Sequence, residues 1–501
     1  MLGFTRIVSV VVASSLFSVL VACGARDGET EVRVAMIGNP GGPFETGARL
    51  SPAGQIVRAA TSDGLVGFDE QGRVIPAMAE RWIVTDDGLS YIFRLRDGTW
   101  PDKSPMTSAS VASALQQSLA ALAGTGLAAD IGRIDSIVAR TGRVLEVRLE
   151  RPNPEFLQLL AQPEMTFLAR GRGNDNGRSR GTGAMRLTRD GNAALLTPVP
   201  PESRGLPSVR DWNERARTVR LQAMPAEKAI AAFKERQADM VLGGTMADFP
   251  LARTIGIARG TVALDPVQGL LGLIFSNDAG FLSSPGNREA IAMTIDREAF
   301  AADLDATGWL PTTRVGPSGL EGDSGAVGER WAGRPVQDRI AEARVRVDRW
   351  RESGEPVPKL RIALPPGPGA DLLFDRLASD LGAIGVAVQR VPQNDEADLR
   401  LIDVVARYPR PHWFLDQLRC AARRGLCSPL ADSLAERARQ SEDPAERATL
   451  LAQAEAELTL ENAYVPLGAP LRWSVLRRRM TGFAPNRLAV HPLLPIAMLP
   501  R

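Results

Sequence analysis

Alternating and continuous apolar stretches predict the strands of this chain. Residues 90–96 (SYIFRLR) place Tyr91, Phe93 and Leu95 on one face and Arg94 and Arg96 on the other. Residues 145–149 (LEVRL) alternate in the same way, and both segments predict half-buried strands. Residues 270–277 (LLGLIFSN) are apolar almost throughout, which predicts a strand covered on both faces.

Segments with apolar residues at helical spacing lie between these predicted strands. In residues 108–122 apolar side chains recur every four positions, which predicts a helix, and residues 226–238 also predict a helix. A third helix carries Leu373, Leu377 and Leu381 between apolar strands at 360–364 and 386–391. This β-α-β order indicates an α/β lobe.

Turn and helix-start signals separate the predicted elements. Asp86-Asp87-Gly88 precedes the strand at 90–96 and predicts a hairpin turn, because Asp and Gly favour tight turns. Asp443-Pro444 predicts the start of a late helix, with aspartate as the cap and proline in the first turn. Residues 314–357 are rich in Gly, Pro and charge and predict no clear element.

The N-terminus has the pattern of an export signal. Arg6 precedes an apolar run over residues 7–22, which is shorter than the roughly 20 residues of a permanent membrane-spanning helix. The run ends in Leu-Val-Ala-Cys23, which resembles the bacterial lipobox and predicts a lipidated Cys23. A plain secretory signal followed by an incidental cysteine is the alternative.

Residues 76–105 (PAMAERWIVTDDGLSYIFRLRDGTWPDKSP) resemble the signature of the family 5 extracellular solute-binding proteins, the peptide- and nickel-type receptors of ABC importers. Weaker resemblances to this family follow in the same order along the mature chain, including an Ile-Asp-Arg sequence ending at Arg297, whose Asp296 and Arg297 we interpret as a helix-end ion pair. The signature matches are Pro76, Ala79, Glu80, Trp82, Asp87, Gly88, Tyr91, Phe93, Leu95, Arg96, Gly98, Trp100, Asp102, Pro105 and Thr107.

The resemblance implies a two-lobed α/β fold of the periplasmic-binding-protein type (type II, cluster C), with an extra subdomain inserted in lobe I. It implies a signal peptide at 1–23 and a second lobe at 263–473. Lobe I then comprises residues 24–55, 185–262 and 474–501, and the inserted subdomain comprises residues 56–184.

Composition gives little support to other classes of function. The net charge of +2 gives no reason to expect nucleic acid, and two histidines with three scattered cysteines show no metal-ligand spacing. Serine-hydrolase and zinc-protease motifs are absent from the sequence, although paired carboxylates leave a glycosidase open. We expect no enzyme activity and no cofactor.

Residues 399–418 resemble the family's cleft-facing segment and carry most of the predicted ligand site. Arg407 stands where peptide receptors place an aspartate for the ligand's ammonium group, so it favours a carboxylate or phosphate. Alternatively, Arg407 turns away from the cleft and pairs with an acidic neighbour. The predicted ligand-binding residues are Arg407, Tyr408, His412, Trp413, Asp63 and Asn277.

Cys420 and Cys427 enclose a short loop, and in an exported protein they predict a disulfide. The implied function is capture of a peptide or similar solute between the lobes and delivery to an ABC permease with its ATPase. Receptors for anionic or metal-chelate solutes, and ligand sensors without transport, are the alternatives. We expect a monomer in the periplasm, anchored to the cell envelope by lipid.

Overall fold

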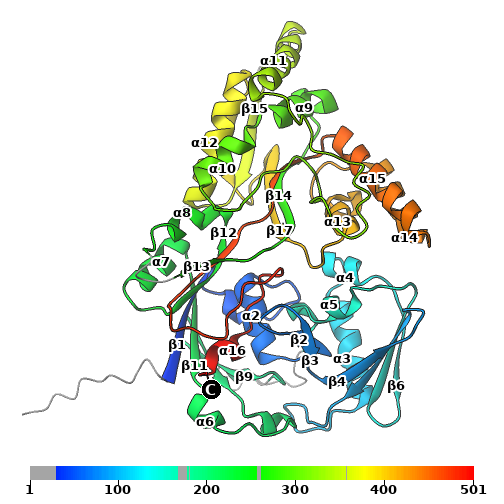
Figure 1. Ribbon diagram of the computed structural model, residues 1–501, viewed down its shortest axis with the longest axis vertical. Coiled ribbons are helices and arrows are strands. Elements are labelled where there is room, and N and C mark those ends of the chain that lie inside the picture. The colour runs from blue at the N-terminus through cyan, green and yellow to red at the C-terminus, as the bar shows by residue number, and fades with distance from the viewer. Residues whose placement is uncertain (1–29, 168–177, 180, 257–260, 357, 501) are drawn as a thin grey trace, which may run out of the picture.

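The described residues form three sheets of four or more strands, arranged as two bodies in the lower part of Figure 1 and one above them. The computed structural model describes residues 30–167, 178–179, 181–256, 261–356 and 358–500. The predicted signal segment, with Cys23, lies outside the described residues, and so do most of residues 170–181, a stretch rich in Gly and Arg.

The eight-stranded sheet of lobe I joins segments from both ends of the chain. Its central strand β1 pairs in parallel with β11 and β12, and antiparallel strands complete both edges. In spatial order the strands are β13 (Thr261–Leu264), β19 (Arg472–Leu476), β12 (Met240–Thr245), β1 (Glu31–Ile37), β11 (Thr218–Met224), β10 (Ala193–Pro198), β9 (Met185–Asp190) and β8 (Arg178–Ser179).

The inserted subdomain contains the hairpin predicted from the signature. Strands β4 (Ala79–Val84) and β5 (Ser90–Leu95) are antiparallel, and Gly88 in the turn adopts φ 67°, which favours glycine. The sheet continues with β7 (Val144–Leu149) and β6 (Ile134–Arg140), and α3 (Ser108–Ala121) contacts both. Tyr91, Phe93 and Leu95 are buried, as their alternation predicts.

Lobe II is the α/β unit predicted from the β-α-β pattern. Strand β14 (Gly269–Phe275) is buried at every residue, and α12 (Pro368–Ala383) connects β15 to β16. The five-stranded sheet has the order β16 (Ala387–Pro392), β15 (Lys359–Leu364), β17 (Leu399–Val405), β14 and β18 (Tyr464–Gly468).

The interpretation of Asp296 and Arg297 needs correction. Asp296 and Arg297 do not form an ion pair with each other: Asp296 caps α10 (Arg297–Leu304), accepting from the Ala299 N–H at 3.0 Å. Arg297 is buried and donates to backbone carbonyls, including that of Pro466 at 2.7 Å. Residues 314–357, without clear pattern in the sequence, contain the 17-residue helix α11 (Val336–Glu352).

The chain passes between the lobes at residues 265–268 and returns at 469–471. The predicted division into lobes and subdomain stays a prediction, and the sheet of lobe I takes in short stretches outside its predicted segments: β8, the end of β13 and the start of β19. One hydrophobic cluster includes Tyr91 and Phe156 of the subdomain together with Tyr408 and Phe414 of lobe II. The apolar interior is therefore continuous between these two bodies.

Candidate ligand-binding cleft

A cavity of about 370 Å³ lies where all three bodies meet. The turn between β2 (Val66–Phe68) and β3 (Val74–Pro76) lines it from the subdomain, together with α5 (Phe156–Leu160). The 265–268 connection, the residues after β17 and the C-terminal loop provide the other walls. Its size is within the range of small-molecule sites. The lining residues are Gln71, Gly72, Gln158, Pro266, Gln268, Ala406, Pro409, Pro485, Asn486, Arg487 and Leu488.

Asn486 fixes the C-terminal wall of the cavity. Its side-chain amide donates to the Val490 carbonyl at 2.7 Å, and its backbone N–H donates to Asp265 Oδ1 at 2.9 Å. Asp265 in turn contacts His491 Nε2 at 3.2 Å. These bonds connect the C-terminal loop to the first interlobe connection, so this wall is held in place before any ligand binds.

Arg407 pairs with an aspartate of the subdomain on the other side of the lobe boundary. Its Nη1 lies 2.7 Å from Oδ2 of Asp130, at the end of α4 (Gly126–Ile131). The Asp130 side chain is 1% exposed and that of Arg407 is 27% exposed. The sequence left two orientations open, and the structure has the acidic pairing, with a partner across the cleft.

Burial controls the protonation of Asp130. Loss of solvent raises the pKa of its carboxyl to about 6, although the neighbouring Arg407 acts to lower it. Its second oxygen, Oδ1, is buried and accepts no hydrogen bond from a described residue. The interlobe pair therefore joins a half-exposed arginine to a carboxylate that gains a proton in mildly acidic solution.

Further polar contacts surround this pair. Gln158 donates its amide to the Arg407 carbonyl, and Arg410 Nε lies 2.9 Å from Glu155 Oε1. In Figure 1, α4 and α5 lie directly below α13 (Pro411–Leu418), which begins just after these arginines. Subdomain and lobe II are thus joined by several polar contacts beside the cavity.

The aromatic residues predicted around Arg407 pack inside lobe II or against the subdomain. Tyr408 and Trp413 are buried, and the His412 ring lies 5.2 Å from the Tyr408 ring, centre to centre. Burial lowers the pKa of His412 to about 4, so it is neutral at pH 7 and supplies no cation. None of these three side chains lines the cavity, and their part in ligand binding stays a prediction.

Asp63 and Asn277 do not line the cavity and are engaged in contacts with other residues. Asp63 Oδ2 lies 2.8 Å from Arg96 Nη2 and 3.0 Å from Arg204 Nη2. Asn277 donates to Asp398 Oδ1 at 3.0 Å. Ligand binding by either residue would require these bonds to break.

The sequence did not single out the side chains that line the cavity, nor Asp130, which pairs with Arg407 outside the lining. Gln268, Arg487 and Asp130 sit in segments without a recognisable pattern, and only the three-dimensional fold brings them to the boundary between the lobes. The alternation places Arg96 on the polar face of the predicted strand, but Arg96 is buried against Asp63. Strand β5 ends at Leu95, one residue before the end of the predicted strand, so the alternation does not decide where Arg96 points.

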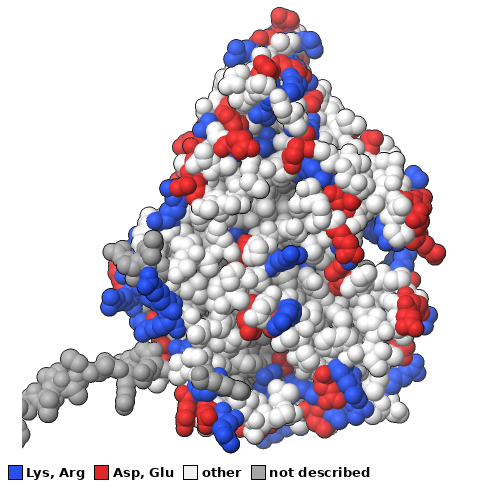
Figure 2. Space-filling model, viewed as in Figure 1, with Lys and Arg blue, Asp and Glu red and all other residues white. Residues whose placement is uncertain are grey.

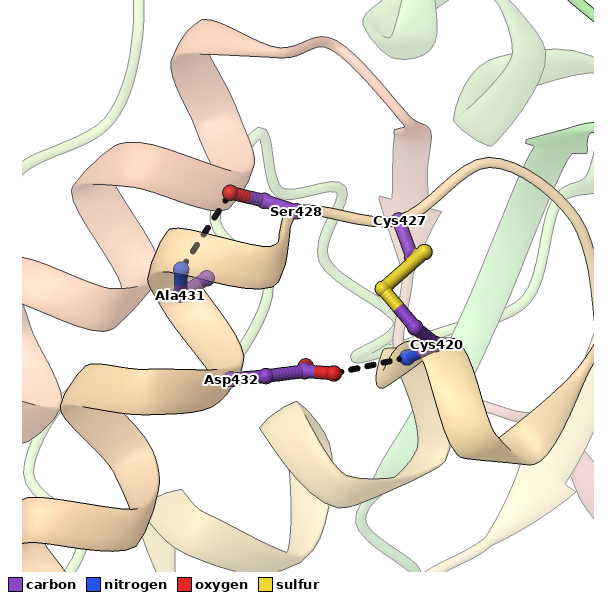
Figure 3. Close-up of a disulfide and its surroundings, with 5 residues drawn as sticks. All are labelled: Cys420, Cys427, Ser428, Ala431 and Asp432. Carbon is purple, nitrogen blue, oxygen red and sulfur yellow. Dashed lines mark hydrogen bonds between the residues drawn. A yellow bond between two sulfur atoms is a disulfide. The ribbon is translucent and has the colours of Figure 1, made fainter.

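Cys420 and Cys427 are joined by a disulfide, with their Cα atoms 5.1 Å apart (Figure 3). The Cys420 N–H donates to Asp432 Oδ2 at 3.0 Å, and Ser428 caps α14 (Pro429–Gln440) through Ala431. The bridge therefore fixes the connection between α13 and α14, next to the interlobe pair.

The remaining surface offers few other sites. Within the described ranges, no group of three or more His, Cys, Asp or Glu side chains is placed to hold a metal, and no helix is long and apolar enough to cross a bilayer. On the face drawn in Figure 2, charged side chains concentrate along the outline, and the band between the lobes is mostly uncharged apart from isolated groups.

Comparison with known proteins identifies the fold and the family of this chain. An alignment of 121 residues is 36% identical between this chain and the probable deoxycholate-binding periplasmic protein YgiS of Escherichia coli. It covers 21% of this chain and 23% of that protein. Di/tripeptide-binding protein 2 of Pseudomonas aeruginosa aligns at 25% identity over 82% of this chain and 84% of its own length. The chain thus spans less than a quarter of the first relative and most of the second.

The murein tripeptide binding protein MppA of Escherichia coli has the same fold, with a TM-score of 0.79 at 18% identity, covering 94% of this chain and 98% of MppA. The unliganded open form of MppA gives a TM-score of 0.61, covering 94% of this chain and 96% of that one. The sequence model of a protein family, the bacterial extracellular solute-binding proteins, family 5 (middle region), matches residues 73–424, well over half of the sequence. The chain belongs to this family of solute-binding proteins.

Proposed function

We propose that this protein is the substrate-binding component of an ABC importer. It captures a peptide or similar small solute between its lobes and delivers it to a permease driven by an ATPase. The observation that carries the proposal is the cavity of about 370 Å³ at the junction of the two lobes and the subdomain. Relatives named as binders of deoxycholate and of di- and tripeptides support a small solute.

Capture by closure requires contacts that exist only when the lobes are together. The Arg407–Asp130 pair and the Arg410–Glu155 pair meet this requirement, because each joins lobe II to the subdomain. A ligand that contacts both bodies then shifts the population toward the closed state. Relatives that are named as periplasmic proteins support a location in the periplasm, where we propose that the protein acts as a monomer.

Native mass spectrometry of the full chain isolated from its own host tests this function. A bound solute should be released on denaturation and should reappear after incubation with the purified compound, without chemical change. Turnover of the solute, or deletion of the gene without any effect on uptake of that solute, would contradict the proposal.

We propose further that the mature protein is a lipoprotein anchored through Cys23, on the lipobox-like sequence before that residue. A Cys23→Ala variant should be exported but recovered in the soluble fraction instead of the membrane pellet. Persistent sedimentation of the variant with membranes would exclude lipidation at Cys23.

A further inference from the structure

The cavity lining contains one charged side chain, and it is basic. Arg487 is exposed, and none of its nitrogens makes a hydrogen bond or ion pair with another described residue. The other described lining residues are neutral amides, prolines, alanine, glycine and leucine. An arginine without a partner at the wall of a cavity is suited to a carboxylate, phosphate or sulfonate, because its planar fork donates two parallel hydrogen bonds.

Carboxylates near the cavity are already occupied. Asp265 accepts from the Asn486 N–H and contacts His491, and it is buried. Glu70 accepts from the amide of Gln71 at 3.3 Å. Asp130 is paired with Arg407 and lies outside the lining. No carboxylate belongs to the lining, so an ammonium group in this cavity would lose water beside Arg487 without an anionic partner in the wall, which is unfavourable.

Gln268 places a second requirement on the chemistry of the ligand. Its side-chain oxygen Oε1 is buried and accepts no hydrogen bond from the described part of the chain. Its backbone carbonyl is used, since it accepts from the Ala406 N–H at 2.7 Å, so the residue itself is held in position. A buried acceptor without a donor is costly, and a ligand N–H or O–H group would satisfy it.

We propose that the cavity takes a small organic monoanion that carries an N–H or O–H donor and no cationic group, such as an N-blocked peptide acid. Arg487 binds the anionic group, and Gln268 Oε1 accepts from the donor. Pro266, Pro409 and Pro485 provide rigid apolar walls for the rest of the ligand. The inference rests on the proposed function and specifies the class of solute that the importer accepts.

Pooled dipeptides of mixed composition, prepared with four combinations of ends, are the probe. The ends are free or acetylated amines, combined with free or amidated carboxyl groups, and retention by the full-length protein is read by native mass spectrometry. We expect the acetylated acids to be retained about tenfold more strongly than their amides or than the free-amine acids, as for loss of one charge-assisted hydrogen bond. Equal retention of all four pools, or preference for free amines, would overturn the inference.

Variants of Arg487 and Gln268 show which of these residues determines the preference for acids over amides. Arg487→Gln should abolish the preference for acids over amides, and Arg487→Lys should keep part of it. Gln268→Leu should weaken all pools without changing that preference. Arg349→Gln, which removes an exposed arginine from α11 at the far end of lobe II (Figure 1), is the matched control and should change neither. An acid preference that persists in Arg487→Gln would exclude Arg487 as the anion site.

The outcomes separate this inference from the proposed function. A host-derived solute that carries an amine, bound between the lobes, overturns the monoanion class but leaves the receptor function intact. A protein that carries no host-derived solute and retains none of the pools contradicts the receptor function itself.

Discussion

Two buried aspartates, each paired with arginine, contact different parts of this molecule. Asp63 lies between Arg96 and Arg204, whose side chains are 5% and 14% exposed, and all three belong to the subdomain and lobe I. Asp130 pairs with Arg407 across the boundary with lobe II. In the proposed closure, the first group stays intact in both states, whereas the second pair forms only when the lobes are together. The same chemistry then contributes to folding in one place and, under that proposal, to the open–closed equilibrium in the other.

The largest effect is expected from Asp63→Asn. It leaves two largely buried guanidinium groups without a counter-charge, which should lower the free energy of unfolding by about 3–5 kcal/mol. Urea denaturation measures this loss, and ligand affinity of the folded fraction should be unchanged. As a control, Glu80→Gln removes a half-exposed partner of Arg94 and should cost at most about 1 kcal/mol. Similar losses for both variants would show that burial does not matter here.

The disulfide supports the lobe II side of the interlobe pair. Replacing both cysteines, Cys420→Ser with Cys427→Ser, should lower the free energy of unfolding by about 2.5 kcal/mol, because the short loop gains freedom in the unfolded chain. Denaturation of the wild type in a reducing agent should give the same value, and the reducing agent should not affect the double variant. A wild-type protein insensitive to reduction would contradict this role.

Arg407→Gln should have a smaller effect that depends on pH. Because the pKa of Asp130 is raised to about 6, the folded state holds this proton more strongly than the unfolded chain does. The contribution of Asp130 to stability therefore falls as pH rises from about 4 to about 6 and is level above. Without Arg407 the pKa rises further, so the variant should lose about 2 kcal/mol at pH 8 and clearly less at pH 5, where Asp130 is protonated.

Denaturation at both pH values, with ligand titration at pH 8, measures this difference. Asp130→Asn is the matched variant: it removes the titrating group, and Arg407→Gln added to it should cost the same at both pH values. An Arg407→Gln variant with equal losses at pH 5 and pH 8 would show that the charge of Asp130 is not what Arg407 stabilises. Arg407→Asp, which places a second carboxylate beside Asp130, should weaken ligand binding more than Arg407→Gln.

Most of the scaffold could be predicted from local patterns. The hairpin around Asp86-Asp87-Gly88, the buried strand β14 and the unit of β15, α12 and β16 depend on periodicity and turn chemistry within a few residues. Helix α11 was missed because its face against the core is narrow, with only Ala343 and Val347 fully buried among many charged residues.

The candidate site could be predicted only in part. Arg407 was identified because it reverses a charge in the family's pattern, but its partner Asp130 is 277 positions away, and nothing in the sequence around it predicts the pairing. Gln268 and Arg487 have no periodic or motif signal, since an unsatisfied acceptor and an unpaired cation are properties of the folded surroundings. Contacts between distant segments decide these roles, and local sequence does not contain them.

The hydrophobic cluster shared by the subdomain and lobe II has a thermal consequence. In the proposed closure, separation of the lobes hydrates the apolar surface of this cluster that lies between the subdomain and lobe II, and closure removes that water again. Closure on a ligand therefore carries a negative heat-capacity change beyond that of the ligand's own burial. Because apolar association weakens on cooling, the closed state is stabilised less at low temperature, and the affinity for the solute falls with it.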